Sequence, residues 1–78
     1  MTTRDKDVSR AIGDALTRAK TDAGLTFEDL AQMTGLSRPH VTRILYGTID
    51  PRVGDLRRLC ELLEVDPHSV LCGALAPS

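Results

Sequence analysis

Apolar residues recur at helical spacing near the start of the chain. Four of them lie at positions i, i+4, i+7 and i+11, namely Ile12, Leu16, Ala19 and Ala23. Charged residues stand between them, so a helix here would have one apolar face and one solvated face. The spacing predicts a first helix, and Gly24 is expected to end it because glycine adopts the left-handed conformation easily.

A second apolar stripe lies in the C-terminal third of the chain, formed at i, i+3, i+4 and i+7 by Leu56, Leu59, Cys60 and Leu63. It predicts another helix, although Arg52 and Gly54 stand where a capping hydroxyl and a good helix former are favoured. Asp66 followed by Pro67 is a strong helix-start signal. We therefore expect a short last helix from about Pro67 to Cys72.

Between these stripes, capping residues predict a helix of barely two turns. Thr26 is a good N-cap, and Asp29 stands three residues after it, as in a capping box. Gly35 suits the left-handed position that ends such a helix. The predicted helix therefore spans about residues 27 to 34.

The next helix follows at once. Ser37 is a favourable N-cap, and Pro39 falls in the first turn, where its missing N–H costs nothing. Gly47 provides the stop. The pattern predicts a helix from about Ser37 to Tyr46, so that two short helices are joined by a tight glycine turn.

The composition fits a small all-α protein. The chain has 78 residues, 41% of them hydrophobic, with one Phe, one Tyr and no Trp. A core built from Leu, Ile, Val and Ala favours closely packed helices over aromatic-rich strands. We expect one compact five-helix domain over residues 8–73, a flexible arm over 1–7 and a tail over 74–78.

Neither a membrane span nor an export signal is expected. The apolar runs are too short to cross a bilayer, and the first seven residues are charged where a secretory signal would be apolar. These features predict a cytoplasmic protein with no membrane partner. Cys60 and Cys72 are then expected to be buried, reduced thiols.

The cysteines do not predict a metal site. His68 and Cys72 would share a helix face, but together with Cys60 their spacing matches no common zinc pattern. We expect no metal, no other cofactor and no small-molecule ligand. An enzyme is not expected either, because no nucleophile, base and orienting group are grouped together.

The charges are unevenly distributed. The net charge is −1, which argues against binding nucleic acid by bulk electrostatics. However, residues 37–52 carry Arg38, Arg43 and Arg52 against Asp50 alone, and residues 53–78 carry four acids against two arginines. One short stretch is therefore basic, and it coincides with the second of the two short helices.

Two short helices with this turn have the geometry of a DNA-reading helix-turn-helix. Such a motif needs a small residue where the helices cross, a positive φ in the turn and an apolar inward residue in the second helix. Ala31, Gly35 and Val41 meet these needs. The remaining buried positions are expected to be Leu30, Leu36 and Ile44.

The segment TFEDLAQMTGLSRPHVTRILYG, followed by Pro51 and LRRLCELLEVDP, resembles the Cro and lambda-repressor-like (XRE) helix-turn-helix family over about Ala23 to Leu71. The resemblance implies a lambda-repressor-like DNA-binding domain whose third helix enters the major groove. It also implies a transcriptional regulator of the repressor type that binds an inverted repeat of double-stranded DNA as a homodimer. The candidate dimer surface is the last helix with Val70, Leu71, Ala74 and Leu75.

Site residues follow from matching positions. Base edges would be read by Arg38, Pro39, Thr42 and Arg43. The DNA backbone would be contacted by Thr26, Phe27, Ser37, His40, Tyr46, Thr48 and Arg52. Four of these residues have a second possible role. Arg38 could contact a phosphate instead of a base, and Ser37 could act as the helix cap. His40 could pack beside the helix start, and Tyr46 could close the edge of the core.

The sequence departs from the family at three positions. Phe27 stands where relatives commonly have a phosphate-binding Gln, so backbone amides would have to replace it. Lys20 and Leu45 stand where relatives have an ion pair, and Pro39 replaces a frequent polar reader. Because of these changes, an antitoxin-like or adaptor module that binds a protein with the same fold is the alternative.

Overall fold

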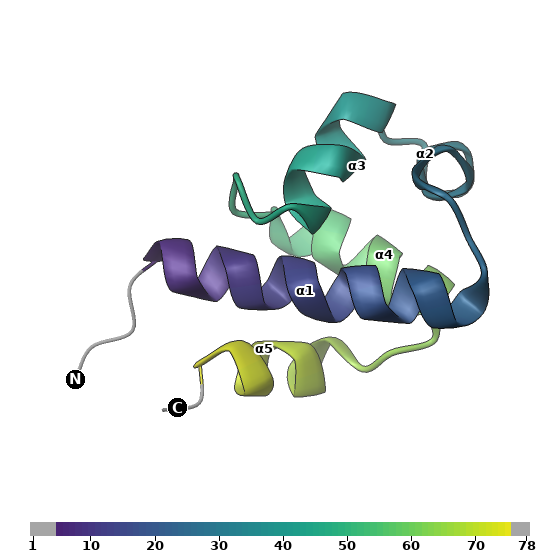
Figure 1. Ribbon diagram of the computed structural model, residues 1–78. Helices are drawn as coiled ribbons and strands as arrows, with labels where there is room; N and C mark the ends of the chain where they lie inside the picture. The colour runs from purple at the N-terminus through teal and green to yellow at the C-terminus, as the bar shows by residue number, and fades with distance from the viewer. Residues whose placement is uncertain (1–4, 76–78) are drawn as a thin grey trace.

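The computed structural model describes residues 5–75, and these form five α-helices without a strand. The helices are α1 (Asp5–Ala23), α2 (Phe27–Thr34), α3 (Arg38–Leu45), α4 (Val53–Leu63) and α5 (Pro67–Leu75). The long α1 crosses the molecule, with α2, α3 and α4 on one side of it and α5 on the other (Figure 1). The predicted all-α, five-helix architecture is confirmed. Within residues 5–75, no helix combines the length and the apolar character that a membrane crossing requires.

Local capping signals set most helix ends. Thr26 and Asp29 form the predicted capping box, because the Asp29 N–H donates to the Thr26 hydroxyl and the Thr26 N–H donates to the Asp29 carboxylate. Ser37 accepts the N–H of His40 at 3.3 Å and so caps α3. The predicted stop glycines Gly24, Gly35 and Gly47 all have positive φ.

Two predicted boundaries are wrong. α1 begins at Asp5, so residues 5–7 are helical and not part of a flexible arm; the exposed carboxylate of Asp7, in the first turn, is favoured by the positive end of the helix dipole. α5 continues past Cys72 to Leu75, because the next residue that cannot continue a helix is Pro77. The rest of the predicted arm and tail, residues 1–4 and 76–78, lies outside the described residues.

The core contains one apolar face from each of α1, α2, α3 and α4. Its buried side chains are Ile12, Leu16, Leu30, Ala31, Val41, Ile44, Leu45, Leu56, Leu59, Cys60 and Leu63. Ala19 and Leu36 pack against this core while partly buried, but Ala23 is exposed in the last turn of α1. The helical stripes therefore predicted the buried faces correctly, apart from the end of the first stripe.

α1 lies close against the end of α3. A Cβ atom added at Gly13 would lie 2.6 Å from the carbonyl oxygen of Leu45 and 2.8 Å from that of Ile44. The Thr17 hydroxyl donates to the Leu45 oxygen at 3.1 Å, one turn further along α1. These contacts fix the end of α3 against the middle of α1.

Asp66 caps the start of α5. Its carboxylate accepts the hydroxyl of Ser69 at 3.1 Å and the backbone N–H groups of Ser69 and His68 at 3.3 and 3.4 Å. The Ser69 hydroxyl, supported by these N–H groups, lowers the pKa of the Asp66 carboxyl below its ordinary value. The ionised carboxylate is therefore the form that stabilises the start of α5.

A lowered pKa makes this cap sensitive to acid. A carboxyl group whose pKa is lower in the folded protein stabilises the fold above its unfolded pKa, and that contribution is lost as the pH falls through the folded pKa. Asn caps a helix about as well as Asp but does not titrate. We expect the Tm of the wild type relative to Asp66→Asn to fall on acidification below about pH 4. An unchanging Tm difference from neutral to strongly acidic pH would contradict this assignment.

Candidate nucleic-acid interface

The helix-turn-helix is formed by α2, α3 and the turn between them. Gly35 has φ 78° and donates its N–H to the Ala31 carbonyl at 2.9 Å, which ends α2. Ala31 and Val41 are buried where the two helices meet. Leu36 is half-buried in the turn. The spacing that predicted the motif therefore corresponds to its actual crossing point.

The predicted base readers lie on the outer side of α3. Arg38, Pro39 and Arg43 are exposed, and in residues 5–75 no acid pairs with either arginine. Thr42 is half-buried, and its hydroxyl donates to the Arg38 carbonyl at 2.9 Å. The two guanidinium groups are consequently free to donate hydrogen bonds to a ligand, whereas the Thr42 hydroxyl proton is already engaged within the helix.

An aromatic pair lies beside the start of α2. The Phe27 and Tyr46 rings meet edge to face, with centroids 5.7 Å apart, and the Lys20 ammonium lies 4.9 Å from the centre of the Phe27 ring. Lys20 also donates to the Leu25 carbonyl at 3.3 Å. Tyr46 is 64% exposed, so it does not close the core edge.

This group explains one departure from the family. Phe27 cannot contact a phosphate as Gln does, but its ring holds the positive charge of Lys20 near the N-terminus of α2. Lys20 is a candidate phosphate contact that the sequence analysis did not identify, although the short turn between α1 and α2 places it directly beside the start of α2. The α1 side chain that bonds to the Leu45 backbone is Thr17, and Lys20 bonds to Leu25 instead.

In the loop that follows α3, the predicted backbone contact Thr48 is used inside the protein, whereas Arg52 is not. Thr48 donates its hydroxyl to the Arg43 carbonyl at 3.1 Å, which satisfies the end of α3. Asp50 accepts the Ser9 hydroxyl and ties the following loop to α1. Arg52 is exposed at the start of α4 and makes no side-chain capping bond. Its guanidinium is therefore available at the edge of the loop that follows α3.

His40 faces a neighbouring helix. Its Nε2 atom lies 3.0 Å from Oδ2 of Asp55, in the first turn of α4. The sequence suggested two roles for His40, a contact to the DNA backbone and packing beside the helix start. The structure gives the ring a polar partner within the protein, as the second role requires.

The two cysteines differ in environment. Cys60 is buried, and this burial, followed by the charge of Asp66, raises the pKa of its thiol. Cys72 is exposed, so its predicted burial is wrong; its sulfur lies 3.4 Å from Nε2 of His68 on the solvent side of α5. Cys60 does not join that pair, and no group of three potential metal ligands occurs in the part of the chain that the structure describes.

These features define an all-α protein with an exposed basic helix in a helix-turn-helix. The family model described as "Helix-turn-helix domain" matches residues 11–71, and the chain belongs to this family. The match includes most of α1, beyond the segment whose resemblance was visible in the sequence.

Two similar solved structures are of the same gene regulator. The crystal structure of the clp gene regulator ClgR from Corynebacterium glutamicum is similar, with a TM-score of 0.79 and 25% identity over 86% of this chain and 71% of that chain. A second crystal structure of ClgR from this organism gives a TM-score of 0.77 at 25% identity, over 86% of this chain and 87% of that one.

Proposed function

We propose that this chain is a sequence-specific transcriptional regulator that binds double-stranded DNA, with the Cro and lambda-repressor-like (XRE) family as its subclass. The observation that carries the proposal is the pair of unpartnered arginines, Arg38 and Arg43, on the exposed side of α3. The similarity to a gene regulator supports it. We assign it the role of a cytoplasmic repressor, without catalytic activity or a cofactor.

The geometry supports base contacts by some residues of the interface and phosphate contacts by others. Arg43 would donate both guanidinium hydrogen bonds to a guanine edge, the commonest specific contact in the major groove. Pro39 offers apolar contact to a thymine methyl. Lys20 with Tyr46 at one place, and Thr48 with Arg52 at another, would contact phosphates and fix the orientation of α3.

Selection of bound duplexes from a random pool tests this function. An enriched inverted repeat would support specific binding and pairing of two chains together. The proposal would be refuted if no sequence were enriched and random duplex were not retained at low salt. That outcome would favour the adaptor alternative, whose partner would be a protein.

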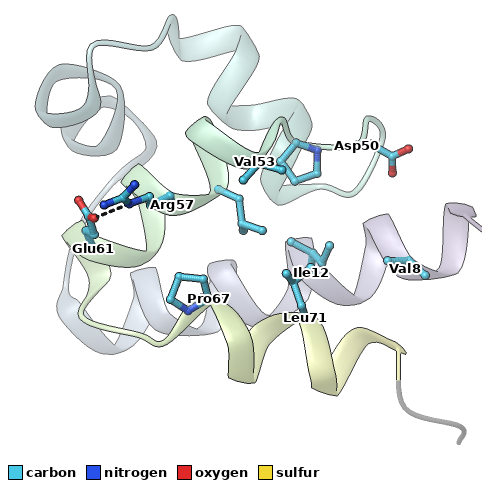
Figure 2. A pocket seen from close by; sticks show the side chains of 10 residues that line it. Val8, Ile12, Asp50, Val53, Arg57, Glu61, Pro67 and Leu71 are labelled. Carbon is cyan, nitrogen blue, oxygen red and sulfur yellow. Dashed lines mark hydrogen bonds and ion pairs between the residues drawn. The ribbon is translucent and has the colours of Figure 1, made fainter.

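We also propose that two copies bind together, because one recognition helix with a few basic contacts provides little beyond non-specific affinity. An apolar groove of about 660 Å³ lies among α1, α4 and α5 (Figure 2). Its apolar lining is Val8, Ile12, Pro51, Val53, Leu56, Pro67 and Leu71. Val53, which lines the groove, is 84% exposed. The surface therefore has a projecting apolar side chain next to an apolar hollow.

A second copy suits this groove because a two-fold interface needs a self-complementary surface. The groove edge also carries both signs of charge, with Asp50 at one part and the Arg57–Glu61 ion pair at another. Val70 is half-buried against the core, so Leu71 is the α5 residue best placed for such a contact.

We expect Leu71→Gln to weaken binding to a two-half-site duplex by about 1 kcal/mol or more, because burial of a leucine contributes about 1.5–3 kcal/mol. Binding to one half-site should be unchanged. Cys72→Ser, at the exposed neighbouring position, is the matched control. Sedimentation of the complex gives the number of chains per duplex. One chain on one asymmetric half-site would contradict the two-copy arrangement.

A further inference from the structure

The hydrogen bond between His40 and Asp55 joins the proposed recognition helix to α4. Nε2 and Oδ2 are 3.0 Å apart, and the two side chains are 33% and 16% exposed. Both residues lie in the first turn of their helices. The pair is therefore partly shielded from water, near the end of α3 that carries Arg38 and Pro39.

This bond bridges two helices whose backbones are not in direct contact. α3 packs against α1 and α2, and no Cα atom of α3 lies within 8 Å of one in α4. α1 meets α3 at the opposite end, through Gly13 and Thr17. Among the hydrogen bonds of residues 5–75, the His40–Asp55 bond joins the side chains of α3 and α4 at the N-terminal end of α3.

In the described part of the chain, Asp55 is the charged group bonded to the His40 ring. α3 itself carries Arg38 and Arg43, and α2 carries Glu28 and Asp29. Asp29 is engaged by the Thr26 N–H. On α4, Glu61 pairs with Arg57, and Arg58 has no bond to the ring. The charge state of the ring therefore acts mainly on Asp55.

We propose that His40 is a positioning residue for the recognition helix and that its protonation strengthens DNA binding. This inference rests on the proposed DNA-binding function. The histidine side chain ordinarily changes charge between about pH 5 and pH 8. With a neutral ring, the negative charge of Asp55 is uncompensated beside the surface that meets phosphates. With a protonated ring, the bond becomes a charge-assisted ion pair, holds α3 more firmly and cancels that charge.

The test is duplex affinity as a function of pH at fixed salt, with any random duplex as the probe. We expect the wild type to bind roughly two- to fivefold more tightly at about pH 6 than at about pH 8, the range that one partly exposed ion pair supplies. His40→Gln keeps a hydrogen-bond donor toward Asp55 but cannot become charged. It should bind with little dependence on pH.

His68→Gln is the matched control, because His68 lies on α5 and contacts Cys72. It should keep the pH dependence of the wild type. Asp55→Asn removes the compensated charge and should lower the pH dependence while raising affinity at about pH 8. Circular dichroism at both pH values verifies that each variant is folded.

The outcomes separate this inference from the proposed function. Salt-dependent binding with a flat wild-type pH profile would overturn the role of His40 alone. A pH dependence that persists in His40→Gln but disappears in His68→Gln would overturn it as well. Absence of duplex binding at every pH and salt would instead refute the DNA-binding proposal on which the inference rests.

Discussion

Gly13→Ala is expected to unfold most of the protein at physiological temperature. The new methyl group would lie 2.6 Å from the Leu45 carbonyl oxygen, 2.8 Å from that of Ile44 and 2.9 Å from the Gly47 nitrogen. All three are backbone atoms, so no side chain can rotate away. Overpacking of this kind costs about 3 kcal/mol or more, most of the roughly 3–5 kcal/mol that a domain of this size has.

Gly54→Ala is the matched control, because the same substitution at this position meets nothing within 4 Å. Gly54 lies in the first turn of α4, and alanine there should stabilise the protein by about 0.5–1 kcal/mol. Thermal unfolding followed by circular dichroism compares the two. If both variants gain stability alike, α1 and α3 are not packed as closely as the structure has them.

The positions of the five helices could be predicted because their signals are local. The Thr26–Asp29 capping box and the glycine stops act within a few residues, and they lie where the sequence predicts them. The apolar stripes also indicated the buried faces. The start of α1 and the end of α5 were missed because no strong cap or stop lies at Asp7 or Cys72.

Contacts between distant residues could not be predicted in this way. The closeness of Gly13 to Leu45 depends on how α1 crosses α3, and hydrophobic spacing contains no crossing distance. The same holds for His40 at Asp55. The interface residues were assigned by matching positions in the family, but their partners within the protein came only from the fold.

Arg43→Ala and Arg52→Ala are expected to impair DNA binding in different ways while both keep the fold. Arg43 is exposed in the last turn of α3, and Arg52 is exposed at the end of the following loop. Loss of a bidentate base contact at Arg43 should cost about 1–3 kcal/mol on the preferred site and little on random DNA. Discrimination at one base pair should therefore relax.

Loss of Arg52 should weaken binding to all sequences alike. Removal of one phosphate contact lowers the slope of log K against log salt by about one unit, because fewer counterions are released. Arg18→Ala is the control for the loss of one exposed positive charge. Arg18 lies beside Glu64 and Val65 at the α4–α5 turn, so its removal should leave both the specificity and the salt slope nearly unchanged.

Arg43→Lys separates the charge of Arg43 from its geometry. Lysine keeps the positive charge but lacks the planar pair of donors that matches a guanine edge, so specificity should fall while affinity for random DNA is retained. All variants are measured on the selected and random duplexes across a salt series. If Arg43→Ala lowers affinity equally for every sequence, Arg43 contacts a phosphate, and base reading passes to the exposed Arg38 in the first turn of α3, together with Thr42.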